Sequence, residues 1–177
     1  MTATTATPLE RALVEEATRK SGLVWVRGAG PARALWHVWH EGAALLVGDG
    51  PGEQPLPGLV AGERAEVTVR GKDKGARVVG WVADIEELAP DSAEWEAAVA
   101  ELKGKRLNAP DAETMPRRWA RECRVLRLVP AGSVLPASGT SLAARPLPTA
   151  ATTREAAPEG LPKLLLKRKG RTPRGRG

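Results

Sequence analysis

The sequence is poor in the residues on which most redox, metal and membrane assignments rest. It has no Phe and no Tyr, and its single cysteine is Cys123. One cysteine forms no intramolecular disulfide, and one cysteine with two histidines does not make a cysteine-based zinc site of the usual kind. No apolar run approaches the roughly 18–20 residues of a membrane span, and the first residues lack the basic start and apolar stretch of a signal peptide. We therefore expect a cytoplasmic protein with no membrane span and no metal site.

The net charge of +6 is unevenly distributed along the 177 residues. Residues 1–130 carry 18 basic and 19 acidic side chains, whereas residues 131–177 carry nine basic and two acidic ones. The basic character thus belongs to the end of the chain, which argues against a basic nucleic-acid-binding core. All six tryptophans lie before residue 120, so the large aromatic side chains that anchor a core belong to the first part.

We expect three segments: an N-terminal arm at residues 1–8, a folded domain at residues 9–130, and a disordered tail at residues 131–177. From residue 131 the composition shifts to Ala, Pro, Ser and Thr without helical or strand periodicity, so burial cannot offset the entropy of ordering. Residues 163–177 carry seven basic and no acidic side chains. This cluster either contacts polyanions such as RNA, DNA or anionic membrane without specificity, or is a solvated tail with no dedicated partner.

Two helices are predicted in the folded domain. The first begins at a capping box, with Thr7 as cap, Pro8 at the first helical position and Glu10 three residues after the cap. Its apolar residues at helical spacing are Leu9, Ala12, Leu13 and Ala17. The second helix is expected to begin at Asp91 and to end at Gly104. Its expected buried stripe is Trp95, Ala98, Val99 and Leu102.

Six short β-prone runs are predicted at residues 23–27, 34–40, 43–48, 64–70, 77–87 and 122–129. Many short strands joined by turns argue for a mainly β domain that is a barrel or a sandwich. Closing the strands into a barrel also removes their exposed edges. Residues 105–116 are expected to be a polar connection before the last strand.

The β-prone run at residues 34–40 is apolar on both faces. Its two alternating sides are Leu35-His37-Trp39 and Trp36-Val38-His40. Two apolar faces mean that a helix, a second subunit or a planar ligand covers the outer one. Because His37 and His40 fall on opposite sides of a strand, the pattern argues against a two-histidine metal chelate.

Three further stretches are candidates for ligand contacts, and each has a plainer interpretation. Residues 48–54 are rich in glycine, but Asp49 and Glu53 would repel phosphate, and a flexible loop is the simpler interpretation. Residues 70–77 carry four basic side chains, which can hold a phosphate or form a solvated turn. Trp119, which follows two arginines, can stack on a flat ring or pack in the core.

The order of elements is one helix, three strands, a loop, two strands, a helix and a last strand. This order resembles the flavin-binding split barrels of the pyridoxamine 5′-phosphate oxidase-like superfamily. The resemblance spans about residues 9–130 and follows a pattern of elements, without a strict motif. The stretches that carry it are residues 21–26, 31–42, 44–48, the helix around Trp95 and residues 123–129. It implies a six-stranded split β-barrel of Greek-key type that forms a homodimer.

The same resemblance implies a cofactor in a groove between subunits, either FMN or a deazaflavin, whereas some relatives bind heme. The ring would lie along the run at residues 34–38, and the loop after the third strand would approach the phosphate. Because that loop carries no basic residue, the turn at residues 70–77 is the candidate source of charge. The candidate cofactor-binding residues are Trp36, His37, Val38, Gly48, Gln54, Lys72, Lys74 and Trp119.

The implied activity is an FMN- or deazaflavin-dependent oxidoreductase that acts on a small-molecule redox substrate. No Ser-His-Asp arrangement or paired carboxylate stands out in the sequence, so the cofactor would carry the chemistry, and no catalytic residue is assigned. The alternative is a non-catalytic split-barrel dimer that acts as a binding module, with the basic tail in contact with polyanions. Heme also stays open, with His37 or His40 as its ligand.

Overall fold

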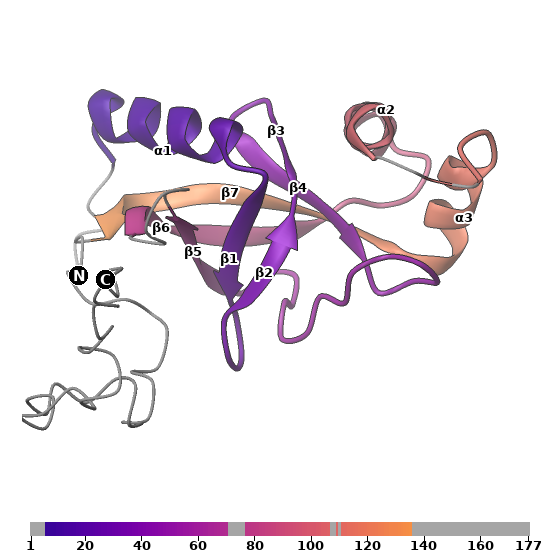
Figure 1. Ribbon diagram of the computed structural model, residues 1–177, viewed down its shortest axis with the longest axis horizontal. Helices are drawn as coiled ribbons and strands as arrows, with labels where there is room; N and C mark the ends of the chain where they lie inside the picture. Colours follow the sequence, from indigo (N-terminus) through magenta and orange to yellow (C-terminus); the bar gives the residue numbers. More distant parts are fainter. Residues whose placement is uncertain (1–5, 71–76, 107–108, 110, 136–177) are drawn as a thin grey trace, which may run out of the picture. The chain divides into compact units, whose positions relative to one another are not determined.

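The structure of the protein is a computed structural model that describes residues 6–70, 77–106, 109 and 111–135, all within one unit of the chain. Figure 1 shows a curved sheet with α1 (Pro8–Lys20) along one side and α2 (Ala93–Lys105) and α3 (Met115–Glu122) together at one end. The strands are β1 (Leu23–Arg27), β2 (Arg33–Trp36), β3 (Val38–His40), β4 (Ala43–Gly48), β5 (Arg64–Arg70), β6 (Arg77–Glu87) and β7 (Arg124–Leu135).

Within the described residues, seven strands form one sheet in the order β2-β1-β5-β6-β7-β4-β3. All neighbours in this order are antiparallel. Strands β5, β6 and β7 follow one another as a meander, and β4 lies beside β7 instead of β5, which is the Greek-key arrangement. The structure therefore confirms the mainly β, barrel-like fold class predicted from the sequence.

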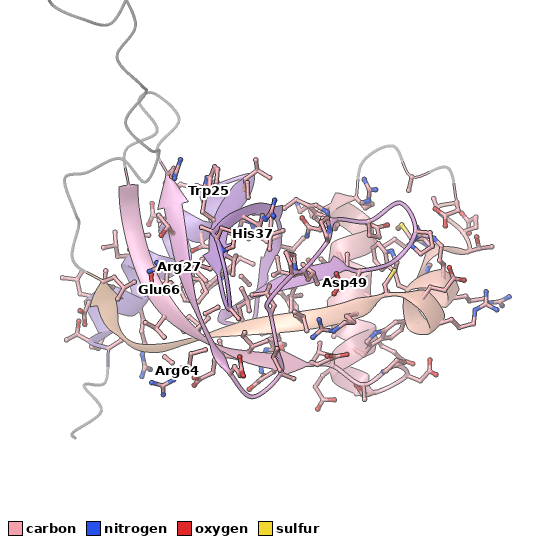
Figure 2. The ribbon with its side chains drawn as sticks, turned by 90° about the horizontal axis from the view of Figure 1, so that it is seen from below. Trp25, Arg27, His37, Asp49, Arg64 and Glu66 are labelled. Atoms are coloured by element: carbon pink, nitrogen blue, oxygen red, sulfur yellow. The ribbon has the colours of Figure 1, made fainter. Side chains whose placement is uncertain are left out.

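The run at residues 34–40, predicted as one strand, is two strands because the chain turns a corner at His37. Strand β2 pairs with β1, whereas β3 pairs with β4. The two outermost strands of the sheet are thus consecutive in the chain, and the sheet nearly closes into a barrel where they meet. Figure 2 shows His37 at this corner. The corner accounts for the seventh strand where six were predicted.

Two clusters of buried side chains pack on opposite faces of the sheet. Strand β4 shows the division, because Leu46 belongs to the cluster inside the barrel, whereas Leu45 and Val47 belong to a second cluster outside it. The second cluster packs β3, β4 and β7 against α2 and α3. It includes Val38 and contacts Trp36, so a helix of the same chain covers the outer face of the run at residues 34–40. This is one of the three coverings that the sequence left open.

The predicted start of α1 is confirmed. Thr7 Oγ1 accepts a hydrogen bond from the backbone N–H of Glu10 at 3.2 Å. In return, Glu10 Oε2 accepts one from the backbone N–H of Thr7 at 2.7 Å. This reciprocal pair is the capping box that the sequence indicates.

The apolar face expected of α1 is buried only in part: Ala17 packs against the core inside the barrel, but the two leucines do not. Leu9 and Leu13 are 80% and 47% exposed, whereas Val14 and Thr18 are the buried residues of this helix. The helix is turned so that Thr18 meets the corner of the barrel, where its carbonyl lies 2.9 Å from Nε2 of His37. A backbone contact of this kind leaves no trace in an apolar pattern, which is why the prediction was wrong in part.

Helix α2 agrees closely with its prediction. Its cap is Ser92, one residue beyond the expected Asp91, and Oγ of Ser92 accepts from the backbone N–H of Trp95 at 3.2 Å. The helix ends at Lys105 instead of Gly104. Its buried residues are the predicted Trp95, Ala98, Val99 and Leu102.

Helix α3 lies partly within the stretch that was predicted to be a polar connection. Met115 and Trp119, four residues apart, are both buried, and together they dock the helix on the outer cluster. Pro116 occupies the first turn, where its missing N–H costs no helical hydrogen bond. Two large apolar residues at helical spacing, one on each side of a proline, were therefore a usable signal, although charged residues surround them.

Strand β7 continues beyond its predicted end at residue 129. Pro130 pairs with Ala83 of β6, and the ladder proceeds through a register shift until Leu135 pairs with Gly80. The basic turn with Lys72 and Lys74 and the tail from residue 136 onward lie outside the described residues. No helix that the structure describes has the length and apolar composition needed to cross a membrane.

Candidate functional site

A pocket of about 490 Å³ lies where the C-terminal ends of α1 and α2 approach the corner between β2 and β3. Its size falls in the range of small-molecule sites. The lining residues are Arg19, Ser21, Gly22, Trp36, His37, Val38, Trp39, Lys105 and Arg106. Two of these side chains are indoles, three are basic and none is acidic. The lining therefore suits a flat ligand that carries negative charge.

Trp36 and Arg106 form one wall of this pocket. The guanidinium carbon of Arg106 lies 5.7 Å from the centroid of the Trp36 ring, within reach of a cation–π interaction. Arg106 follows α2 directly, and its side chain is 28% exposed. Its Nε donates to Oε2 of Glu53 at 3.2 Å, and a terminal nitrogen donates to the carbonyl of Gly52 at 3.0 Å. The loop after β4 thus holds the guanidinium in place beside the indole.

His37 lines the pocket as a neutral imidazole. Its Nε2 lies 2.9 Å from the Thr18 carbonyl oxygen, and because a carbonyl only accepts, Nε2 carries the proton. Burial lowers the pKa of His37, and the hydrogen bond to Thr18 opposes only part of this effect. The other nitrogen, Nδ1, is buried and has no hydrogen-bond partner in the described part of the chain. His37 is therefore held in one tautomer by the end of α1.

Glu53 does not present its charge to the pocket, contrary to the argument that it would repel phosphate. Its carboxylate is fully buried. Besides Arg106, it accepts from a terminal nitrogen of Arg118 at 3.1 Å and from Nε1 of Trp119 at 3.0 Å. Two arginines and one indole thus neutralise and enclose this carboxylate.

Asp49, the second acidic residue of the loop, is also paired. One oxygen accepts from a terminal nitrogen of Arg124 at 3.1 Å, and the other accepts from the backbone N–H of Leu56 at 2.7 Å. Hydrogen bonding to Glu87, and more weakly to Asp49, raises the pKa of Arg124. The two acidic residues of the loop therefore tie it to the domain and do not form a negative surface over the pocket.

Arg118 anchors the loop to α3. Its Nε donates to Oδ2 of Asp111 at 2.7 Å, and a terminal nitrogen donates to the carbonyl of Pro51 at 2.6 Å. The hydrogen bond from Arg118 lowers the pKa of Asp111. Hydrogen bonds to Asp111 and to Glu53 raise the pKa of Arg118. Arg118 therefore stays charged in this network.

Gln54 does not line the pocket. Its side chain bonds the backbone at the end of β2, at the junction of β2 and β3, which we call the seam of the barrel. Its Oε1 accepts from the backbone N–H of Trp36 at 2.9 Å, and its Nε2 donates to the carbonyl of Trp36 at 2.9 Å. Nε2 also lies 3.3 Å from the carbonyl of Val47 in β4. The side-chain amide thus bonds the backbone at the end of β2 as a neighbouring strand would, and it links β2 to β4 at the place where the chain passes from β2 to β3.

Two other predicted cofactor residues are structural parts of the loop and its support. A Cβ on Gly48 would lie 2.2 Å from the carbonyl oxygen of Gln54 and 2.6 Å from Cγ of Leu56, so only glycine lets the loop return this closely. Trp119 has no exposed surface. Of the eight predicted residues, Trp36, His37 and Val38 line the pocket, Gly48, Gln54 and Trp119 do not, and Lys72 and Lys74 lie outside the described residues.

The sequence reasoning missed the basic side of the pocket, which is Arg19, Lys105 and Arg106. Arg19 and Lys105 lie in the last turns of α1 and α2. Basic residues at such positions offset the negative end of a helix, so they gave no reason to look for a ligand. Only the fold shows that the two helix ends meet the same corner.

The pocket does not fit a heme ligated by histidine. Nε2 of His37 is engaged by Thr18 and Nδ1 is buried, so neither nitrogen is presented to iron. His40 does not line the pocket, and its Nε2 lies 3.9 Å from a carboxylate oxygen of Glu41. Among the described residues, no three His, Cys, Asp or Glu side chains gather as a metal-binding group.

No protein-family model and no curated protein matches this sequence. Among solved structures, the chain is similar to HutZ, the heme storage protein from Vibrio cholerae, with 12% identity and a TM-score of 0.49 over 69% of this chain and 90% of that chain. It is also similar to a candidate general stress protein 26 from Jannaschia sp. CCS1, with 13% identity and a TM-score of 0.44 over 67% of this chain and 72% of that chain. At these scores neither similarity carries a ligand or an activity over to this chain.

Proposed function

We propose that the chain binds FMN or a deazaflavin in the pocket at the β2–β3 corner and acts as an oxidoreductase of the pyridoxamine 5′-phosphate oxidase-like type. The observation that carries the proposal is the lining itself: Trp36 and Trp39 with three basic side chains and no acidic one. Indoles pack against a flat ring, and Arg19, Lys105 and Arg106 attract a phosphate.

When bound, a flavin supplies the electron transfer itself, and the residues of this chain bind and orient it. Gln54 bonds the backbone of Trp36, and Glu53 bonds the guanidinium of Arg106. Because these two residues are adjacent in one loop, that loop prepares the pocket before any ligand arrives. Burial also raises the pKa of the Cys123 thiol, which argues against a thiolate nucleophile here.

A homodimer is part of this proposal. Leu23 is 51% exposed and pairs with Trp36 on the neighbouring strand. It follows Gly22, which lines the pocket. A large apolar side chain exposed at the rim of a ligand pocket is what a second subunit would cover.

The test is a titration of the purified protein with FMN, with riboflavin and with a phosphorylated deazaflavin, followed by ligand and tryptophan fluorescence. We expect FMN to bind about tenfold more tightly than riboflavin, because riboflavin lacks the phosphate that the basic residues would hold. Lys105→Gln should weaken FMN binding and leave riboflavin binding unchanged. Arg64→Gln is the matched control, since Arg64 is an exposed residue of β5 that does not line the pocket.

Oxidoreductase activity is tested on the flavin-loaded protein by anaerobic reduction with reduced nicotinamide dinucleotides and reoxidation by quinones. Turnover would support the oxidoreductase. Saturable flavin binding without turnover of any acceptor would favour the binding module. If none of the three compounds binds saturably, the flavin proposal is wrong.

A further inference from the structure

A second pocket, of about 380 Å³, is also lined by Trp39. It is formed by α1, the turn between β3 and β4, and β7. The lining residues are Arg11, Glu15, Trp39, Gly42, Val129 and Pro130. Trp39 therefore contributes to both pockets.

The Trp39 indole, which both pockets share, is held by the core of the barrel. It packs against the core inside the barrel and meets the buried Trp81 edge to face, with ring centroids 6.2 Å apart and an interplanar angle of 87°. This geometry is a favourable aromatic pair. Because Trp81 and the barrel core hold the ring in place, the remaining surface of Trp39 offers a rigid apolar contact to a ligand in either pocket.

The charge in the second pocket is positive. Glu15 is paired with Arg19, one turn further along α1, so its carboxylate is already compensated. The Arg11 guanidinium is exposed, and no ion pair or side-chain hydrogen bond joins it to another residue in the described part of the chain. An unpaired arginine at the mouth of an apolar pocket matches a carboxylate, which it can bind through two parallel hydrogen bonds.

The rest of the pocket lining is apolar. Besides Trp39, the lining has the apolar Val129 and Pro130 of β7, and Gly42, which has no side chain. We propose that this pocket is a subsite for a small aromatic carboxylate, with the ring against Trp39 and the carboxylate on Arg11. Its identification as a substrate subsite rests on the proposed function, because only then does the neighbouring pocket hold a redox cofactor.

The two pockets are joined by an ion pair as well as by Trp39. Glu15 lines the second pocket, and its partner Arg19 lines the first. A carboxylate on Arg11 would lie one helical turn from Glu15 and repel it, which alters the pairing of Glu15 with Arg19. Binding in one pocket should therefore change affinity in the other, and by the same factor in both directions.

The experiment is isothermal titration calorimetry of the full chain with benzoate, in the absence of any flavin. Benzyl alcohol tests the need for charge, and cyclohexanecarboxylate tests the need for an aromatic ring. We expect benzoate to bind saturably and more tightly than both. Arg11→Gln should weaken benzoate binding about tenfold, Arg11→Lys should restore part of it, and Arg33→Gln should have no effect. Arg33 is an exposed arginine of β2 that lines neither pocket.

Equal binding of benzoate by the unmodified protein and by Arg11→Gln would overturn the proposal, as would the absence of saturable binding. Val129→Glu gives a second, independent check, because a carboxylate on the pocket wall should exclude benzoate while circular dichroism shows a folded chain. Flavin titration of the same samples separates the two proposals. Flavin binding without benzoate binding overturns this inference alone, and benzoate binding without flavin binding overturns the proposed function alone.

Discussion

Glu53 is a carboxylate that the fold has removed from water and surrounded with donors. Its side chain has no exposure, and Arg106, Arg118 and Trp119 all bond to it. A buried charge is tolerated only when it is paired, and removing one partner leaves the others uncompensated. The consequence for the pocket is indirect, because Glu53 positions Arg106 and does not itself reach a ligand.

The first prediction concerns the stability that depends on this carboxylate. Glu53→Gln should lower the free energy of unfolding by about 3 kcal/mol, because the fully buried carboxylate is lost and the half-buried Arg106 and Arg118 lose its charge, although Arg118 keeps Asp111. Urea unfolding followed by tryptophan fluorescence measures this loss. Glu66→Gln is the matched control, since Glu66 pairs with Arg27 at the surface (Figure 2 shows both side chains) and should cost less than about 1 kcal/mol. Equal losses in the two variants would contradict the prediction.

The second prediction follows from the neutral state of His37. Burial lowers its pKa in the folded protein, whereas in the unfolded chain the pKa is near the ordinary value of about 6.5. As the pH falls through this value, the unfolded chain takes up a proton that the folded chain does not, so acid destabilises the fold. His37→Gln keeps a donor toward the Thr18 carbonyl and cannot titrate. Its stability should therefore fall less than that of the unmodified protein.

The measurement is the free energy of unfolding in urea at pH 7.5 and at pH 5.5 for both proteins. The difference between the two pH values should be smaller in His37→Gln. His40→Gln, measured in parallel, shows how much of the dependence comes from the second histidine. An identical pH dependence in His37→Gln and in the unmodified protein would show that His37 is not buried in its neutral form.

At the scale of single elements, the loop after β4 holds the corner of the barrel together. At His37 the chain passes from β2, which pairs with β1, to β3, which pairs with β4. The backbone of Trp36 therefore has no neighbouring strand on one side. Gln54 supplies both hydrogen bonds that such a strand would supply. Gly48 allows the close return of the loop that brings Gln54 there. An unpaired backbone group at this seam would otherwise be costly.

The third prediction tests this seam. Gln54→Glu keeps an acceptor for the Trp36 N–H but loses the amide donor and places a carboxylate against the carbonyls of Trp36 and Val47. It should lower the free energy of unfolding by about 1–3 kcal/mol. Amide hydrogen exchange should accelerate at Trp36 and not at Val67, whose strand β5 pairs on both sides. Unchanged exchange at Trp36 would mean that the backbone finds other partners.

The same elements show what the sequence could predict. The capping box of α1, the buried stripe of α2 and the strand positions follow from local rules, because periodicity and caps act within a few residues. The corner at His37 does not, because it depends on two partner strands that are distant in the chain. Helix α3 was hidden for a different reason: Met115 and Trp119 are its only buried residues, and charges surround them.

The site also has a part that could be predicted from the sequence and a part that could not. Trp36, His37 and Val38 were expected at the ligand because the family resemblance places a planar ring along the strand that carries them. The basic side of the pocket was missed because Arg19 and Lys105 belong to two helix ends that meet only in three dimensions. Glu53 was interpreted as a charge that repels phosphate because the sequence cannot show that Arg106 and Arg118 enclose it.

At the scale of the whole molecule, the fourth prediction is the mass in solution. We expect light scattering at micromolar concentration to give the mass of two chains. Leu23→Lys should shift the mass toward one chain, because it places a charge on the exposed apolar rim of the pocket. Leu9→Lys is the control: Leu9 is more exposed, at 80%, but it lies in the first turn of α1, whereas Leu23 directly follows Gly22, which lines the pocket. A monomer mass for the unmodified protein would contradict the proposed dimer.

The fifth prediction concerns the basic segment at residues 163–177, which follows the barrel in the sequence. Residues 163–177 carry seven positive and no negative side chains, and residues 1–135 sum to −1. We propose that this basic segment binds polyanions by charge alone. A truncation that tests this must begin after Leu135, since β7 pairs with β6 as far as that residue. A cut at residue 130 would remove part of the sheet.

Deleting residues 136–177 should abolish binding of a labelled single-stranded RNA in fluorescence anisotropy and leave the melting temperature nearly unchanged. With the full chain, affinity should fall with salt, by about 0.7 in the log–log slope for each phosphate neutralised on a single strand. Replacing the seven basic residues of the segment by glutamine keeps the length of the chain and should remove binding equally. If the truncated protein binds RNA as well as the full chain does, the barrel is the binder, although its net charge is negative.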